Sequence, residues 1–298
     1  MATIGAIATK PLRAGRHGER SPASFVFLIG LWIAVAFAVL CLATLLVDSF
    51  LDGLPRLDSN LVTRYSSQVL PEQAGARAAI LGSIGVIMVT AILSIPLGIA
   101  AAVYLEEFAD SRKWYNRLIE VNLQNLAAVP AIVYGMLTAG LALTIGLKRG
   151  ALVTGGIALA LLILPVIIIT TREALRAVPV EIRQGSLALG ATPFQTVWRQ
   201  TLPAAIPGVS TGTILALSRA LGEAAPLLLL GGLVFVTYDP NGLLSGFTTL
   251  PIQIFEWTGR PQQAFREVAS AAIIILLVLL LAMNALAILI RNRYQKRW

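Results

Sequence analysis

The hydrophobic positions of this 298-residue chain are grouped into long runs, and the polar positions are confined to the segments between them. Five of these runs are uncharged and longer than the roughly 18 residues that separate a membrane-spanning helix from a buried core helix. A sixth apolar segment, 204–238, contains two charges and two prolines. The pattern predicts six transmembrane helices, of which the one over 204–238 is bent or partly broken. The five uncharged runs are 25–47, 78–105, 121–147, 150–171 and 268–290.

This pattern predicts an all-α integral membrane protein with one N-terminal span and a five-span core. The first span should be retained, because its apolar stretch is long, starts only at residue 25 and lacks a small-residue cleavage pattern. The loops 48–77 and 239–267 are long and rich in turn formers, so irregular connections are expected there. The expected parts are a basic tail (1–24), the first span (25–47), an extracytoplasmic loop (48–77), the core (78–290) with an inner loop at 172–203, and a second basic tail (291–298).

Arg219 and Glu223 lie in the interrupted segment, four residues apart. Each charge disfavours insertion near the middle of a bilayer by roughly 2.5–3.5 kcal/mol, so something must offset that cost. One interpretation is a route for a charged solute, with a hinge at Gly222 and Pro226 beside the pair. The other is an intramembrane salt bridge that locks helices or subunits together. Both remain open on the residues alone.

The second inner loop predicts two short helices outside the membrane. Pro179 suits the first turn of one helix, and Gly190 suits the left-handed residue that ends it. Thr192, Pro193 and Gln195 then form a capping box that starts a second helix, which we expect to stop at Pro203. Two tightly terminated helices favour a docking element over a plain linker. In the other inner loop, 111–125, Ser111 is expected to cap a short amphipathic helix along the interface.

Composition agrees with a membrane protein, since 57% of the residues are hydrophobic and only 13% are charged. The formal charge of +8 does not indicate nucleic-acid binding, because the Lys and Arg residues bracket the spans. With both termini in the cytoplasm, the cytoplasmic side carries most of them, as membrane insertion favours. The expected cytoplasmic residues are Lys10, Arg13, Arg16, Arg20, Arg112, Lys113, Arg117, Arg172, Arg176, Arg183, Arg199, Arg291, Arg293, Lys296 and Arg297; the expected outer ones are Arg56, Arg64, Arg77, Lys148, Arg149, Arg260 and Arg266.

The remaining polar and aromatic residues suggest no catalytic or metal centre. The one cysteine, Cys41, is expected to be a buried packing thiol, and His17 a solvated tail residue. Glu106, Glu107 and Asp110 are expected to form a solvated helix end. There is no Gly-x-x-x-x-Gly-Lys-[Ser/Thr] sequence, so any use of ATP must come from another subunit. The expected interfacial anchors at span margins are Tyr104, Trp114, Trp257 and Trp298.

The inner loop resembles that of the transmembrane permease subunits of binding-protein-dependent ABC importers. Their loop carries Glu-Ala-Ala, three residues, Gly, nine residues, Ile, one residue and Leu-Pro. This chain keeps the frame with Gly190, Leu202 and Pro203, while Gln200 stands in place of the Ile. Gln184, Gly185 and Ser186 replace Glu-Ala-Ala. The resemblance implies a MetI-like five-helix core and a coupling helix that docks on an ATPase subunit.

Three further strings resemble the permeases of the phosphate-specific branch of these importers, of the PstA type. They are Leu126-Ala-Ala-Val-Pro-Ala-Ile-Val-Tyr-Gly135, Leu164-Pro-Val-Ile-Ile-Ile-Thr-Thr-Arg-Glu-Ala-Leu-Arg-Ala-Val-Pro179 and Arg219-Ala-Leu-Gly-Glu-Ala-Ala-Pro-Leu227. The resemblance implies that Arg219 and Glu223 line the translocation path for phosphate. It also implies a heterodimer with a sister permease in the inner membrane, a pair of ATP-binding subunits and an extracytoplasmic phosphate-binding protein. The chain itself would bind no cofactor and would not be an enzyme.

Three other functions remain as alternatives. A permease for another oxyanion, or an ion-coupled secondary transporter with Glu223 as its proton site, would use the same charged pair. A non-transporting membrane scaffold would use the pair only to hold helices together.

Overall fold

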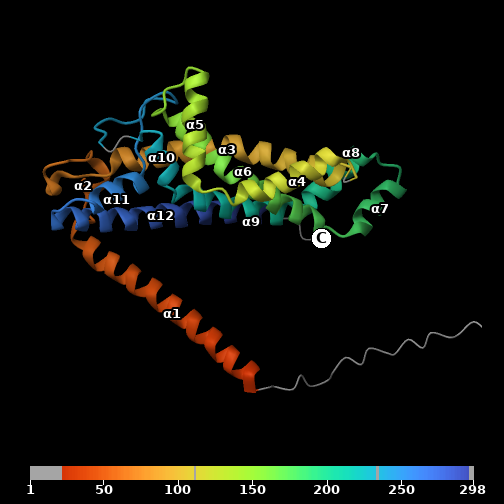
Figure 1. The fold of residues 1–298 in the computed structure, drawn as a ribbon, viewed down its shortest axis with the longest axis horizontal. Helices are drawn as coiled ribbons and strands as arrows, with labels where there is room; N and C mark the ends of the chain where they lie inside the picture. The colour runs from red at the N-terminus through yellow and green to blue at the C-terminus, as the bar shows by residue number, and fades with distance from the viewer. Residues whose placement is uncertain (1–21, 111, 233–234, 295–298) are drawn as a thin grey trace, which may run out of the picture. The chain divides into compact units, whose positions relative to one another are not determined.

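The computed structural model describes residues 22–110, 112–232 and 235–294, which form helices and no strands (Figure 1). The chain divides into two compact units, Met1–Asp48 and Ser49–Trp298. Besides the helices, one isolated bridge pairs Ala151 with Gly246. The helices are α1 (Pro22–Gly53), α2 (Ser59–Thr63), α3 (Arg77–Val103), α4 (Trp114–Ala127), α5 (Ala131–Thr144), α6 (Leu152–Arg176), α7 (Val180–Ala188), α8 (Pro193–Thr196), α9 (Leu202–Leu221), α10 (Ala225–Leu229), α11 (Leu250–Thr258) and α12 (Gln263–Tyr294); short 3₁₀ turns cover Leu54–Arg56 and Pro71–Gln73, and π-helical turns η3 and η4 cover Tyr104–Phe108 and Val197–Thr201.

Within the described residues, five helices are long and apolar enough to cross a membrane, and a bent pair makes a sixth span if it is counted as one. This agrees with the predicted all-α membrane protein of six spans. The five are Ser24–Arg56, Arg77–Phe108, Leu152–Arg176, Pro193–Leu221 and Gln263–Arg293; the bent pair is Trp114–Ala127 and Ala131–Thr144.

The first unit consists of α1 up to Asp48, in which every side chain from residue 24 onward is exposed within the chain. The helix is apolar around its whole circumference, as a lipid-facing span requires. Cys41 is exposed within this unit, whereas the sequence predicts a buried thiol. A single helix has no interior of its own in which to bury a side chain.

The second unit is built around α6, which packs between α3 and α9, while α9 also packs on α12 (Figure 1). Its main apolar core gathers Leu159, Ile163 and Ile167 of α6 with Val86 of α3 and Leu227 of α10. Small residues bring the backbones close. A methyl group at Gly82 would lie 2.0 Å from the Thr248 carbonyl oxygen, so only glycine fits there.

The predicted continuous helix over 121–147 is wrong, because α4 and α5 meet at an angle of 111°. Pro130 lacks an amide hydrogen and disfavours helical geometry in the residue before it, so α4 ends at Ala127. The Tyr134 hydroxyl donates to the Leu126 carbonyl oxygen at 2.8 Å and satisfies one acceptor exposed by the break. The expected amphipathic helix does form, as α4, but it begins at Trp114. The expected Ser111 cap lies outside the described residues.

The loops 48–77 and 239–267 are more ordered than expected. The first loop contains the last residues of α1 and the whole of α2, and the second loop contains α11. Trp257 of α11 is fully buried with Phe265 and Leu61 in a second apolar core, so its expected role as an interfacial anchor is wrong. Hydropathy near a span cannot distinguish a lipid anchor from a tryptophan that packs under a loop. Tyr104 and Trp114 are exposed as expected, and Trp298 lies outside the described residues.

Arg77 joins the start of α3 to the loop 239–249 through Asp239. Its Nε and Nη2 donate to the two carboxylate oxygens at 2.9 and 2.6 Å. The hydrogen bond from Arg77 holds the pKa of Asp239 below its ordinary value of 3.8. A lowered carboxyl pKa in the folded state stabilises the protein above the ordinary pKa, and this contribution is lost as the pH falls through the folded-state pKa.

We therefore expect Asp239→Asn to lower thermal stability slightly at pH 7 and to make no difference once the pH is well below 3.8. Melting curves of the purified protein in detergent from pH 7 to about pH 2 measure this, because the range must extend well below the ordinary pKa of the carboxyl. A difference between the two proteins that stays constant over this range would contradict the assignment.

Candidate functional site

Arg219 and Glu223 contact each other at the end of α9. Arg219 occupies the last turn, and its Nε lies 3.5 Å from Oε1 of Glu223. The Arg219 side chain is 56% exposed and that of Glu223 is 24% exposed. The guanidinium therefore retains donors that the glutamate does not occupy, and an anion at the surface of this unit could accept from them.

The helix is interrupted directly after this arginine. Gly222 ends α9, and the next helix, α10, begins at Ala225. Pro226 occupies the first turn of α10, where its missing amide hydrogen costs nothing. The expected bend is thus a complete break. Pro226 starts a new helix after the break and does not kink a continuous one.

The segment 204–238, predicted to be bent or partly broken, is broken after Leu221, and α10 begins at Ala225. The span ends at Leu221, and residues beyond the break do not continue it. At about 1.5 Å per residue, Arg219 is roughly 26 Å along the helix axis from Leu202. The break leaves polar backbone beside Glu223, which an unbroken helix would hide.

The inner loop forms the two helices predicted on each side of Gly190. Gly190 has φ of +84°, so it ends the turn after α7 in the left-handed conformation. The capping box is present. The backbone N–H of Gln195 donates to the Thr192 hydroxyl at 3.3 Å, and the backbone N–H of Thr192 donates to the side-chain Oε1 of Gln195 at 3.0 Å. Ser186 of α7 and Thr196 of α8 are hydrogen-bonded at 2.9 Å. The loop is therefore a rigid helical corner.

The second helix does not stop at Pro203, contrary to expectation. It runs through η4 into α9, so that Pro193–Leu221 is one helical stretch. The π-helical turn explains how a proline fits: the Leu202 amide already bonds to the carbonyl of Val197, five residues back, and the bonding pattern is shifted before Pro203 is reached. The inner loop is thereby continuous with the helix that ends at Arg219.

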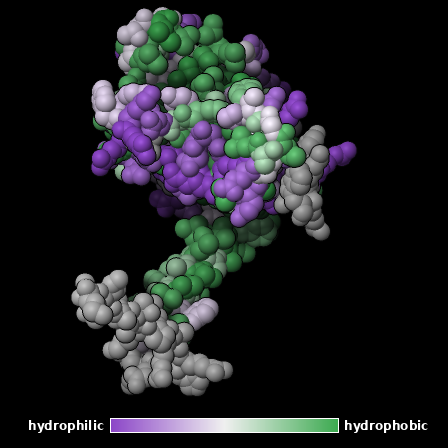
Figure 2. All heavy atoms as spheres, turned by 90° about the vertical axis from the view of Figure 1, so that its right-hand side faces the viewer, coloured by the Kyte–Doolittle hydropathy of each residue, from purple (hydrophilic) through white to green (hydrophobic). Residues whose placement is uncertain are grey.

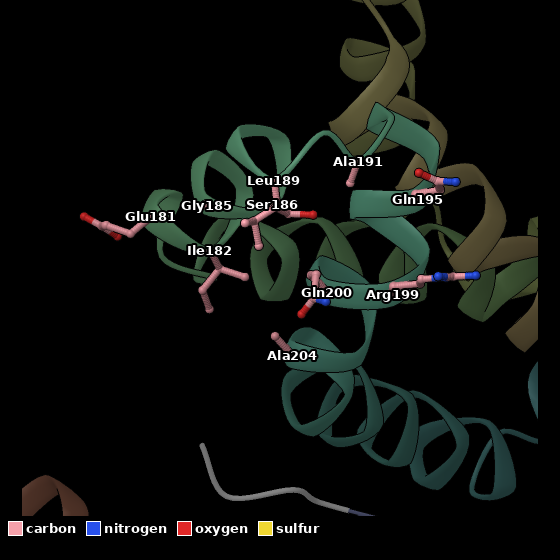
Figure 3. A pocket seen from close by; sticks show the side chains of 10 residues that line it. All are labelled: Glu181, Ile182, Gly185, Ser186, Leu189, Ala191, Gln195, Arg199, Gln200 and Ala204. Atoms are coloured by element: carbon pink, nitrogen blue, oxygen red, sulfur yellow. The ribbon is translucent and has the colours of Figure 1, made fainter.

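A groove of about 460 Å³ lies between α7 and η4 (Figure 3). Gly185 and Ser186 line it, whereas Gln184 is exposed elsewhere on α7. Figure 2 looks onto the end of the second unit that carries α7 and α8, where hydrophilic residues gather. Leu189 is 90% exposed at the end of α7, and sequence reasoning did not single out this exposed apolar residue. Its exposure depends on the turn at Gly190, which no hydrophobic periodicity reveals. The lining residues are Glu181, Ile182, Gly185, Ser186, Leu189, Ala191, Gln195, Arg199, Gln200 and Ala204.

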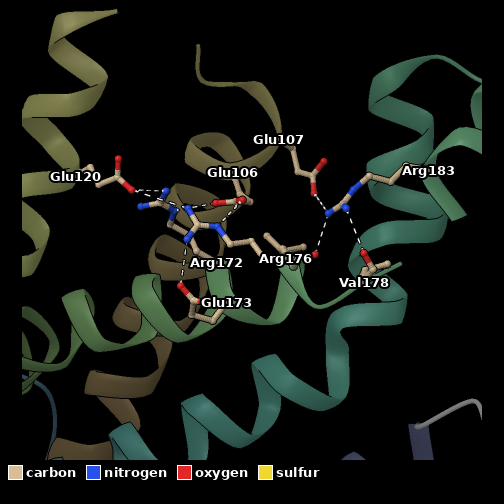
Figure 4. Close-up of polar contacts among 9 residues, drawn as sticks. Glu106, Glu107, Glu120, Arg172, Glu173, Arg176, Val178 and Arg183 are labelled. Carbon is tan, nitrogen blue, oxygen red and sulfur yellow. Dashed lines mark hydrogen bonds and ion pairs between the residues drawn. The ribbon is translucent and has the colours of Figure 1, made fainter. Parts of the chain in front are cut away.

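One ion pair and two hydrogen bonds, all from Arg183, fasten this corner to η3 and to the end of α6 (Figure 4). Arg183 of α7 donates to Glu107 of η3 at 2.7 Å, and also to the carbonyl oxygens of Leu175 at 2.8 Å and Val178 at 3.3 Å. Buried ion pairs with further hydrogen bonds hold their partners in one geometry. The first helix of the corner is therefore tied to the ends of α3 and α6.

A second set of ion pairs continues the network across α6 and α4. Glu106 accepts from Arg172 at 3.1 Å and from Arg176 at 2.8 Å, and Arg172 also reaches Glu120 of α4 at 2.9 Å. The expectation that Glu106 and Glu107 form a solvated helix end is wrong, because their partners lie about 70 residues away in sequence. Among the described residues, no three His, Cys, Asp or Glu side chains are grouped to hold a metal ion. His17 lies outside the described residues.

Residues 94–297 match the family of binding-protein-dependent transport system inner membrane components. The chain is 31% identical, over 92% of its length and 90% of the relative, to the phosphate transport system permease protein PstA of Mycobacterium leprae. It is 35% identical, over 75% of its length and 73% of the relative, to the phosphate transport system permease protein PstA 1 of Mycobacterium tuberculosis.

Among solved structures, a chain of the MetNI methionine ABC transporter in an inward-facing conformation matches with a TM-score of 0.57 and 18% identity, over 72% of this chain and 92% of that one. At this identity the similarity concerns the fold, and it agrees with the MetI-like core expected from sequence.

Proposed function

Because the chain belongs to the binding-protein-dependent transport system inner membrane components, a family of multi-pass membrane permeases, we propose that it is the phosphate permease subunit of an ATP-driven importer. The observation that carries the proposal is its similarity, over nine-tenths of its length, to a phosphate permease. The chain is a transport subunit, and ATP hydrolysis belongs to other subunits.

Arg219 supplies the chemistry that phosphate needs. Inorganic phosphate carries one or two negative charges at neutral pH, and an uncompensated anion in a low-dielectric path would face a large desolvation cost. The planar guanidinium offers N–H donors that match two phosphate oxygens and stays charged at physiological pH. Glu223, 3.5 Å away, competes with the ligand for the same donors and prevents it from being held too tightly.

The exposure of Arg219 on a single chain suits a path shared by two permeases. A sister subunit packed against this surface would enclose the guanidinium in a lumen between the two chains. The same pair used only as an intersubunit lock would need a partner group on the sister chain and no solvent access.

The corner formed by α7, Gly190 and α8 is the proposed contact with the ATPase subunits, with α4 beside it. Its exposed Leu189 and its groove offer an apolar surface with polar edges, as docking requires. Gln184, Gly185 and Ser186 lie on α7 at this contact, and Leu202 and Pro203 carry it into α9. Movement of the corner would tilt α9 and change the side to which Arg219 opens.

In the proposed orientation the subunit lies in the inner membrane with both termini in the cytoplasm. The ends of α3 and α6, the corner and α4 then share the cytoplasmic side, which is supported by their ion-paired Arg residues. An extracytoplasmic phosphate-binding protein would deliver the ligand from the opposite side.

The proposal is tested by reconstituting the chain in vesicles with the sister permease and ATPase subunits and adding the loaded binding protein. Uptake of radiolabelled phosphate should require ATP and should be competed by excess unlabelled phosphate. Uptake driven by a pH gradient without ATP would indicate a secondary transporter, and absence of any phosphate uptake from an intact complex would overturn the proposal.

A further inference from the structure

Two segments that are nearly a hundred residues apart in sequence contact each other in the fold. They are 126–135 and 219–227. Gly135 of α5 lies against the backbone of Pro226 in α10. A methyl group at Gly135 would lie 2.6 Å from the Pro226 carbonyl oxygen and 2.8 Å from its Cα. These neighbours are backbone atoms, which cannot rotate away as a side chain can. The contact requires glycine and brings α5 directly against the start of α10.

The same contact fixes the backbone on one side of Glu223. Pro226 and Leu227 are buried after it, and Leu221 is buried before it, so the break is held at both ends. Glu223 itself is only 24% exposed and faces the guanidinium of Arg219. Three residues, 220–222, separate Arg219 from Glu223, and the distance between the two charges depends on their backbone. A shift of α10 would therefore change the distance and angle between the Glu223 carboxylate and the Arg219 guanidinium.

α5 is in turn held at a fixed angle to α4. The bond from the Tyr134 hydroxyl to the Leu126 carbonyl oxygen closes the 111° elbow. Tyr134 is 5% exposed and belongs to the core that includes Leu227 of α10. On the α4 side of the elbow, Glu120 is paired with Arg172 of α6. The elbow thus connects the ion-pair network near α7 with the break beside Glu223.

We infer that Tyr134 and Gly135 are positioning residues for the charged pair: they hold α10 so that Glu223 faces Arg219, and they link that geometry to the cytoplasmic network. The inference rests on the proposed function, since it concerns the transport path. It gives the string 126–135 a physical role that its hydrophobicity does not suggest.

The test compares Gly135→Ala with Gly140→Ala in the complete reconstituted complex. Both glycines lie in α5, but a methyl group at Gly140 meets no atom within 4 Å of it. We expect Gly140→Ala to match the unmodified complex. Gly135→Ala should reduce phosphate uptake at least about tenfold and raise the ATP hydrolysed per phosphate transported by a similar factor. The ratio is informative because a purely structural defect lowers the amount of complex and leaves the ratio in assembled complexes unchanged.

Tyr134→Phe is the second variant, because it keeps the ring in the core and removes only the hydroxyl that closes the elbow. It should raise the same ratio by a few fold in a fully assembled complex. If the ratio stays unchanged in Tyr134→Phe, or if Gly135→Ala equals Gly140→Ala, the inference is overturned. If the unmodified complex takes up no phosphate, the proposed function fails instead, so the two failures can be told apart.

Discussion

Replacing Arg219 with Gln is expected to abolish phosphate uptake while the complex assembles normally. Glutamine is uncharged and lacks the planar fork of donors, so it neither offsets desolvation of the anion nor replaces the charge-assisted hydrogen bonds of the guanidinium. A hydrogen bond to a charged group contributes about 1.5–3 kcal/mol, so losing two of them predicts a fall of at least about hundredfold in uptake. Initial rates of ATP-driven uptake, normalised to assembled complex, measure this.

Arg219→Lys is the matched control for this prediction. Lysine keeps the charge but not the planar fork, so intermediate uptake is expected. The opposite pattern would contradict the path assignment. If Arg219→Gln impaired assembly but left the assembled complex fully active, the pair would be a structural lock between helices or subunits.

Replacing Gly190 with Val is expected to uncouple ATP hydrolysis from transport. Gly190 adopts a φ of +84°, which a β-branched residue strongly disfavours. No atom lies within 4 Å of an added Cβ, so the effect is conformational strain of at least about 1–2 kcal/mol and not a clash. Val should therefore reshape the turn between α7 and α8, displace Leu189 and reduce uptake at least about tenfold while ATP hydrolysis continues.

Gly146→Val provides a control with the same kind of strain. Gly146 has a φ of +74° and also has open space around it, but it lies in the turn between α5 and α6. Both variants should lose similar thermal stability, and only Gly190→Val should change the ATP hydrolysed per phosphate. If the two variants hydrolysed the same amount of ATP per phosphate transported, the α7–α8 corner would not be the element that links ATP hydrolysis to transport.

Local sequence signals predicted those features that depend on neighbours in the chain. The capping box of Thr192 and Gln195, the left-handed Gly190 and the apolar helices all follow from short-range rules, because the groups that satisfy one another are within a few residues. The charged pair is of the same kind, since Arg219 and Glu223 are one turn apart. Their spacing on one helix face could be predicted before the fold was known, but neither their direct contact nor the complete break after Gly222 could.

Expectations failed where a distant segment supplies the partner. Glu106 and Glu107 look like a solvated helix end in sequence, but Arg172, Arg176 and Arg183 come from beyond two further helices. Trp257 looks like an interfacial anchor until Phe265 and Leu61 bury it. Hydropathy reports the cost of leaving water, and it does not report which surface takes the side chain.

By itself, the sequence determined that this is a helical membrane protein with a capped inner corner and a charged pair, since those properties arise from composition and from contacts within one or two turns. Only the tertiary structure decided that Gly135 meets Pro226, that α4 and α5 form an elbow, and that ion pairs join α3, α4, α6 and α7. These depend on the packing of helices far apart in sequence, and close backbone approach at glycine is a property of the two surfaces together.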